Sequence, residues 1–102
     1  MDREALLEHL RKLKKTYQQE GFVIEGIFGS ALSPETDTPG DIDLLVHTTP
    51  EFSRRYRFDS IRRYREIGEE IAQTLGYPVD LASSTGMGET ARKYILEKTL
   101  YL

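Results

Sequence analysis

The sequence contains no cysteine, and none of its apolar runs approaches the roughly 18 residues that a membrane-spanning helix needs. Without cysteine there is no disulfide framework, no thiolate metal site and no cysteine nucleophile. Residues 1–4 do not resemble the start of a secretory signal peptide. These absences favour a cytoplasmic protein that does not enter a membrane.

What remains is the composition of a small globular protein. The 102 residues are 38% hydrophobic and 30% charged, which is too apolar for a disordered chain. This length predicts a single domain over residues 1–102 and leaves no room for a separate substrate domain. The net charge of −3 argues against broad nucleic-acid binding.

Hydrophobic residues recur at helical spacing in three segments and at strand spacing in three others. Gly21 and Gly76 follow the first and second helical segments, where glycine commonly ends a helix. The elements predict an α/β fold with a small mixed sheet of about three strands flanked by helices, the first two strands being antiparallel. The predicted helices cover residues 2–20, 58–75 and 89–102, and the predicted strands cover residues 22–28, 41–47 and 79–82.

The central helix carries an apolar stripe that predicts the face packed on the sheet. Gly68 lies inside this stripe and predicts close contact with a strand, because glycine costs about 1 kcal/mol relative to alanine in a helix. The stripe consists of Ile61, Tyr64, Ile67, Gly68, Ile71 and Leu75.

Two acidic residues stand at the start of the second predicted strand. Side chains alternate along a strand, so Asp41 and Asp43 point the same way, with Cα atoms roughly 6.5 Å apart. At that separation two carboxylates can share one divalent cation. Without a metal, a cationic partner or free access to water, their like charges repel each other.

The first predicted strand ends abruptly in Gly29 and Ser30, ten residues before Asp41. A turn that joins a strand to a helix and contains a glycine and a hydroxyl commonly forms a phosphate-binding site, here called the phosphate seat. Free backbone N–H groups and the helix dipole favour an anion there. We predict a short helix at residues 30–32 to complete this seat. A phosphate seat beside a carboxylate pair indicates nucleotide chemistry.

The sequence thus contains Gly29-Ser30, a spacer of ten residues, and Asp41-x-Asp43. This combination resembles the signature of the minimal nucleotidyltransferases, small members of the DNA polymerase β-like superfamily. Within that family, the chain most resembles the MNT antitoxins encoded beside HEPN-domain ribonuclease toxins, over nearly its whole length. The resemblance implies a nucleotidyltransferase-like fold and transfer of a nucleotidyl group, as AMP from ATP, to a hydroxyl. The implied acceptor is a tyrosine of the HEPN toxin, which AMPylation would silence.

The resemblance also implies roles for individual residues. Asp41 and Asp43 would be the main ligands of one or two Mg²⁺ ions, completed by a third acid on a later strand. The candidate for this third acid is Asp80, which would ligate the second metal or act as base on the acceptor hydroxyl. Gly29 and Ser30 would hold the β- and γ-phosphates of ATP.

A second charge feature spans the start of the central helix, with six arginines and one aspartate between residues 54 and 65. Pairing with later glutamates on a solvated helix face accounts for part of it. Most of the arginines precede those acids, however, so several stay unpaired. We therefore expect a partner protein to bind here through Arg62, Arg63 and Arg65, and no direct binding of nucleic acid.

Two alternatives to protein AMPylation remain open. The loop after Ser30 is acidic at Glu35 and Asp37, where many relatives carry a basic residue that neutralises triphosphate charge. A non-catalytic antitoxin that neutralises its partner by binding alone is therefore the first alternative. The second is transfer to a small molecule, as in aminoglycoside-modifying relatives, which the missing second domain argues against.

Overall fold

The computed structural model describes residues 3–28, 41–85 and 88–102, so the short helix predicted at residues 30–32 lies outside the described residues. None of the helices within these ranges is both long enough and apolar enough to cross a membrane. In chain order the elements are α1 (Arg3–Gln18), β1 (Phe22–Phe28), β2 (Ile42–Thr48), α2 (Pro50–Tyr56), the 3₁₀ turn η2 (Arg57–Asp59), α3 (Ser60–Leu75), β3 (Val79–Ser83), α4 (Glu89–Glu97) and β4 (Leu100–Tyr101).

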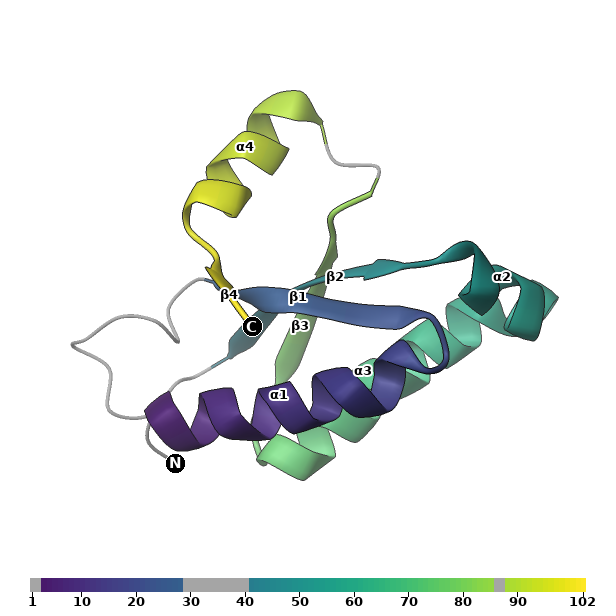
Figure 1. Ribbon diagram of the computed structural model, residues 1–102, viewed down its shortest axis with the longest axis horizontal. Coiled ribbons are helices and arrows are strands. Elements are labelled where there is room, and N and C mark those ends of the chain that lie inside the picture. Colours follow the sequence, from purple (N-terminus) through teal and green to yellow (C-terminus); the bar gives the residue numbers. More distant parts are fainter. Residues whose placement is uncertain (1–2, 29–40, 86–87) are drawn as a thin grey trace.

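The strands form one mixed sheet in the order β3-β2-β1-β4 (Figure 1). β1 pairs antiparallel with both β2 and β4, whereas β2 and β3 run parallel. A parallel pair needs a crossover connection, which α2 and α3 supply. The predicted antiparallel pairing of the first two strands is confirmed, and the described chain has four strands where about three were predicted.

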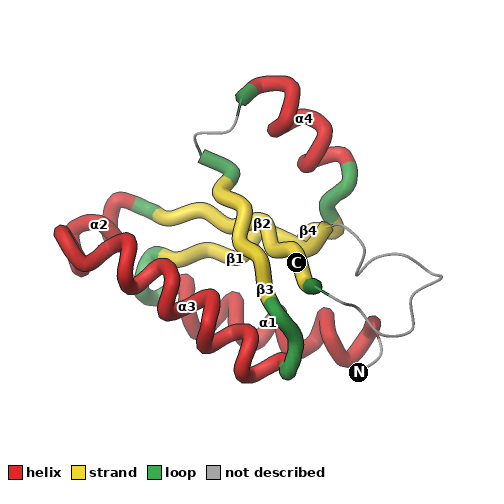
Figure 2. Tube along the Cα trace, turned by 180° about the vertical axis from the view of Figure 1, so that it is seen from behind, coloured by secondary structure: helices red, strands yellow, loops and turns green. Residues whose placement is uncertain are grey.

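Helices α1 and α3 lie on one face of the sheet, and α4 projects on the opposite side (Figures 1 and 2). The hydrophobic core fills the layer between the sheet and the first two of these helices. Burying one large apolar side chain stabilises a fold by about 1.5–3 kcal/mol. The core residues with no exposed surface are Leu10, Phe22, Ile24, Ile27, Ile42, Leu44, Val46, Ile67 and Ile71.

The close contact between helix and strand that Gly68 predicts is confirmed. A Cβ atom added at Gly68 would lie 3.1 Å from Leu81 Cδ1 on β3, closer than side chains normally approach. The absence of a side chain therefore lets α3 lie directly on β3. This contact packs α3 against the strand at one end of the sheet.

The first residue of the predicted stripe does not reach the core. Ile67 and Ile71 are fully buried, but Ile61 is 74% exposed. Helix α3 begins at Ser60 instead of near Phe58, since residues 57–59 form the turn η2. Helical spacing identifies which residues share a face, but not how far along the helix the sheet extends to cover that face.

The predicted helix over residues 89–102 is wrong in its second half. α4 ends at Glu97, and the chain then enters β4, which pairs with β1. A Cβ atom at Gly26 would lie 2.5 Å from the Leu100 carbonyl oxygen, so glycine is what lets the two strands approach. The spacing of two between Leu100 and Leu102 is strand spacing, and the helical prediction overlooked it.

Candidate active site

The pairing of three strands brings three acidic residues to one region of the sheet. Asp43 on β2 lies opposite Phe28 of β1 on one side and opposite Asp80 of β3 on the other. Asp41 comes just before β2, two residues ahead of Asp43, and is close enough for its charge to act on the Asp43 carboxyl. We call Asp41, Asp43 and Asp80 the carboxylate edge.

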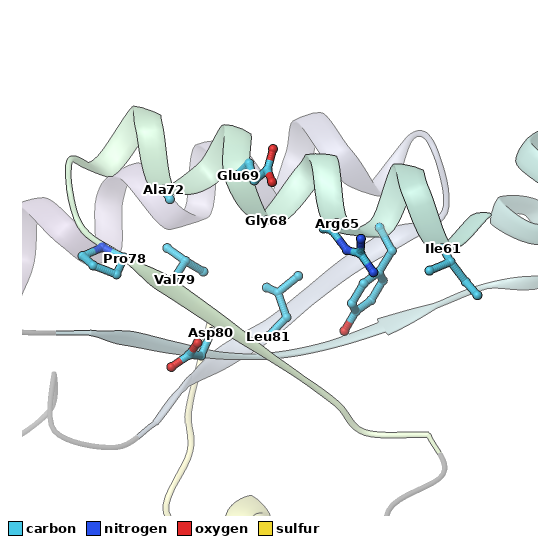
Figure 3. A pocket seen from close by; sticks show the side chains of 10 residues that line it. Ile61, Arg65, Gly68, Glu69, Ala72, Pro78, Val79, Asp80 and Leu81 are labelled. Atoms are coloured by element: carbon cyan, nitrogen blue, oxygen red, sulfur yellow. The ribbon is translucent and has the colours of Figure 1, made fainter. Parts of the chain in front are cut away.

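Asp43 and Asp80 lie on the face of the sheet away from α1 and α3. Leu44 is buried in the core, so its neighbour Asp43 faces the other way. On β3, Val79 and Leu81 point toward α3 whereas Asp80 points away from it (Figure 3). Asp80 therefore faces opposite its two apolar neighbours, as strand alternation predicts.

Asp43 is the most enclosed member of the carboxylate edge. It is half-buried, whereas Asp41 and Asp80 are exposed. Burial raises the pKa of the Asp43 carboxyl, and the negative charges of Asp80 and Asp41 raise it further. All three causes oppose ionisation, so a cation bound at this edge would relieve an existing repulsion.

The donor chemistry of this edge fits a hard cation such as Mg²⁺, which prefers carboxylate oxygens. The three carboxylates do not converge on a single point, since no three His, Cys, Asp or Glu side chains of the described residues are arranged to hold a metal ion. Asp41 and Asp80 are exposed, so other side-chain rotamers are open to them. Asp43 would therefore be the fixed ligand, and the other two would turn toward the cation.

The predicted phosphate seat, Gly29 and Ser30, lies outside the described residues. The strand that these residues follow, β1, ends at Phe28 directly opposite Asp43. The two predicted phosphate-binding residues thus continue from a strand end that adjoins the carboxylate edge.

A family model described as a nucleotidyltransferase domain matches residues 6–102, a span that contains all three aspartates. The chain belongs to the nucleotidyltransferase domain family. A solved structure provisionally described as a minimal nucleotidyltransferase has a TM-score of 0.77 to this chain at 24% sequence identity, covering 100% of this chain and 97% of that one. This likeness confirms the predicted fold. A comparison with curated proteins gives no match.

The three arginines predicted to bind a partner have different environments in this nucleotidyltransferase. Arg62 and Arg65 are exposed. The Arg63 side chain is only 18% exposed, and its Nε and Nη2 atoms each donate a 2.8 Å hydrogen bond to Glu20. Its Nη1 atom donates a 2.7 Å hydrogen bond to Glu70. The donors of Arg63 are thus engaged within the chain, whereas Arg65 is exposed and Arg62 forms an exposed ion pair with Asp59.

Arg63 is the centre of what we call the Arg63 cluster, which also contains Glu20, Glu70, Tyr17 and Tyr56. Tyr17 on α1 donates a 2.7 Å hydrogen bond to Glu70, and Tyr56 on α2 donates one to Glu20. The hydrogen bonds from Arg63 lower the pKa of Glu20, and the hydrogen bond from Tyr17 lowers the pKa of Glu70. Sequence reasoning missed this cluster because Glu20 and Arg63 are 43 residues apart, far beyond helical spacing.

A groove of about 540 Å³ lies between α3 and β3 (Figure 3). Ile61, Ala72 and Leu81 contribute to its apolar walls, and Arg65 lies on the α3 side. Asp80 belongs to the strand wall of the groove, and its carboxylate points to the opposite face of the sheet (Figure 3). This nucleotidyltransferase thus has an open surface beside the strand that carries Asp80.

Proposed function

We propose that this nucleotidyltransferase transfers AMP from ATP to a tyrosine hydroxyl of a HEPN-domain ribonuclease toxin, in a Mg²⁺-dependent reaction that silences the toxin. The observation that carries the proposal is the carboxylate edge, where burial and then the charges of Asp80 and Asp41 raise the pKa of Asp43. These causes oppose ionisation of the Asp43 carboxyl, and a divalent cation carrying a triphosphate would relieve that opposition.

When bound, one or two Mg²⁺ ions would neutralise charge on the triphosphate. Asp41 and Asp43 would hold the cation, and Gly29 and Ser30 would hold the β- and γ-phosphates. Asp80 is exposed and would take the proton of the acceptor hydroxyl, unless it serves as a ligand of the second ion. The tyrosine oxygen forms a bond to the α-phosphorus while the bond from that phosphorus to the β-phosphate oxygen breaks, and pyrophosphate leaves.

The surface of the groove between α3 and β3 favours a protein acceptor over a small molecule. The groove that Asp80 lines also contains Ile61, which is 74% exposed, and Arg65, which is exposed. Arginine is enriched in protein interfaces, and exposed apolar side chains supply their buried centre. The same surface would also serve an antitoxin that acts by binding alone, so experiments must separate the two functions.

Asp43→Asn separates catalysis from binding. The replacement keeps the size of the side chain and removes a charge that would hold the cation, so transfer should fall on the order of 10²–10³-fold or more while the complex still forms. The measurement is the intact mass of the HEPN protein after incubation with ATP and Mg²⁺, which reports added adenylyl groups. Glu8→Gln, an exposed acid on α1, is the matched control and should leave transfer unchanged.

Dose and ATP dependence distinguish an enzyme from a protein that masks its partner. An enzyme silences an excess of ribonuclease, requires ATP, and leaves the ribonuclease inactive after the enzyme is removed. Strict one-to-one inhibition that ignores ATP, together with full activity of Asp43→Asn, would end the catalytic proposal.

A further inference from the structure

We infer that Phe58, Ile61, Arg65 and the groove between α3 and β3 form the docking surface for the acceptor protein, and that its occupant is an acidic segment with an apolar anchor. The inference deepens the proposed function and rests on it for the identity of the acceptor.

The apolar part of the docking surface is unusually exposed. Phe58 and Ile61 are the two most exposed large apolar side chains among the residues the structure describes, at 104% and 74%. A second hollow of about 200 Å³, lined by Ile61, Tyr64 and Phe52, continues the surface toward α2. Exposed apolar surface next to a groove marks a site of protein contact, because it costs free energy in water and is buried on binding.

The backbone at this point is held in a rare conformation. Arg57 has a φ angle of +49°, uncommon for any residue except glycine, and such conformations cost about 1–3 kcal/mol. Phe52 and Tyr56 on α2 contact the core, and the break at Arg57 takes Phe58 off that face. Strain of this kind persists mainly at functional sites. The chain therefore keeps a costly turn that leaves Phe58 in water.

The surrounding charges favour an acidic protein over other occupants. Arg55, Arg57 and Arg65 are exposed and form no ion pair with another described residue. A symmetric contact between two copies would place these arginines against one another, whereas carboxylates on a partner would complement them. Nucleic acid fits less well, because its phosphates would leave the exposed apolar surface of Phe58 and Ile61 without an apolar partner.

The groove also lies beside β3, a strand whose outer edge can pair with a further strand. β3 is at one end of the sheet order, so its outer edge has no strand partner in the described parts of the chain. An extended segment can add to such an edge through main-chain hydrogen bonds, with alternate side chains entering the groove. Pro78, Asp80 and Leu81 line the strand side. Because side chains alternate between the two faces of a sheet, the remaining side chains of such a segment, an acceptor hydroxyl among them, would lie on the face that Asp80 occupies (Figure 3).

The test uses Ile61→Asp, Phe58→Ala and Arg65→Glu, each a change at an exposed side chain that leaves the core intact. Each variant should raise the KM for the HEPN protein, used as acceptor, at least about tenfold, because anchors at an interface centre dominate binding energy. The KM for ATP should stay unchanged. Tyr94→Ala is the matched control, since Tyr94 is 65% exposed on α4, away from the groove. Unfolding temperatures confirm that each variant is folded.

The outcomes separate this inference from the proposed function. In one outcome, the unaltered chain binds the HEPN protein but transfers no AMP, and Phe58→Ala loses the binding. This outcome would support the docking surface and reject the catalysis. AMP transfer with an unchanged KM for the HEPN protein in all four variants would support the catalysis and reject the docking surface. Complex formation that requires nucleic acid, or a concentration-dependent dimer of this chain that Phe58→Ala dissociates, would overturn the inference, as would no binding at all.

Discussion

The carboxylate edge and the Arg63 cluster both gather acidic side chains, but with opposite electrostatic results. In the Arg63 cluster, two carboxylates share one guanidinium, and the pKa values of Glu20 and Glu70 are lowered. At the carboxylate edge, burial and then the charges of two further acids raise the pKa of Asp43. The first arrangement stabilises charge and joins three helices, whereas the second leaves negative charge for a ligand to neutralise. The direction of the pKa shift thus distinguishes acids that hold the fold from acids available for function.

The largest expected effect is that of Arg63→Met. This change leaves Glu20 and Glu70 without their guanidinium, and Glu20 is only 17% exposed. We expect the free energy of unfolding to fall by about 2–4 kcal/mol, below the loss for a fully buried pair because water still reaches the site. Denaturant unfolding measures it. Arg62→Met, at a side chain 71% exposed, should change stability by less than about 0.5 kcal/mol. Equal losses in the two variants would contradict a structural role for the cluster.

Acid should weaken the same cluster by protonating its carboxylates. The folded-state pKa values of Glu20 and Glu70 lie below the ordinary value of 4.5. Their contribution is therefore complete above pH 4.5 and is lost as the pH falls through the folded-state values. We expect the free energy of unfolding to fall more steeply below pH 4.5 in the unaltered chain than in Arg63→Met. Parallel pH profiles of the two proteins would show that other groups cause the acid sensitivity.

The smallest expected effect has the opposite sign and comes from the carboxylate edge. The folded-state pKa of Asp43 lies above its ordinary value of 3.8, so its contribution to stability is present below pH 3.8 and lost as the pH rises through the folded-state value. At neutral pH, Asp43→Asn should therefore raise the free energy of unfolding by about 0.2–1 kcal/mol.

Magnesium sharpens this comparison of stabilities. Mg²⁺ should raise the unfolding temperature of the unaltered chain, because a cation that binds only the folded state stabilises it, and it should do so much less in Asp43→Asn. Glu8→Gln should respond to Mg²⁺ as the unaltered chain does. A destabilised Asp43→Asn protein would show instead that Asp43 supports the fold.

Sequence patterns located those parts of the fold that depend on near neighbours. The strand predicted at residues 22–28 has the bounds of β1, and Gly68 correctly indicated a contact between helix and strand. The parts that were missed depend on distant residues. Ile61 is exposed because the sheet does not cover the start of α3, and β4 forms because Gly26 leaves space beside β1. Spacing within one segment cannot reveal what another segment covers.

The candidate site divides in the same way. Alternation along the strands predicted the faces on which Asp43 and Asp80 lie, but only the pairing of β2 with β3 places them opposite each other. Arg63, one of the three arginines predicted to bind a partner, forms an ion pair with Glu20, which no helical spacing connects to it. Partner binding through these arginines stays a prediction. The roles of Gly29 and Ser30 remain predictions.

The pairing of β4 with β1 has a consequence for how the protein is made. Gly26 pairs with Tyr101, so the outer edge of β1 stays open until the ribosome has added the intervening residues. At about 5–20 residues per second, that interval is roughly 4–15 s. An uncovered strand edge can pair with a strand of another nascent chain during this time. On a polysome, where identical chains emerge close together, it is in these seconds that β1 is most vulnerable to misassembly.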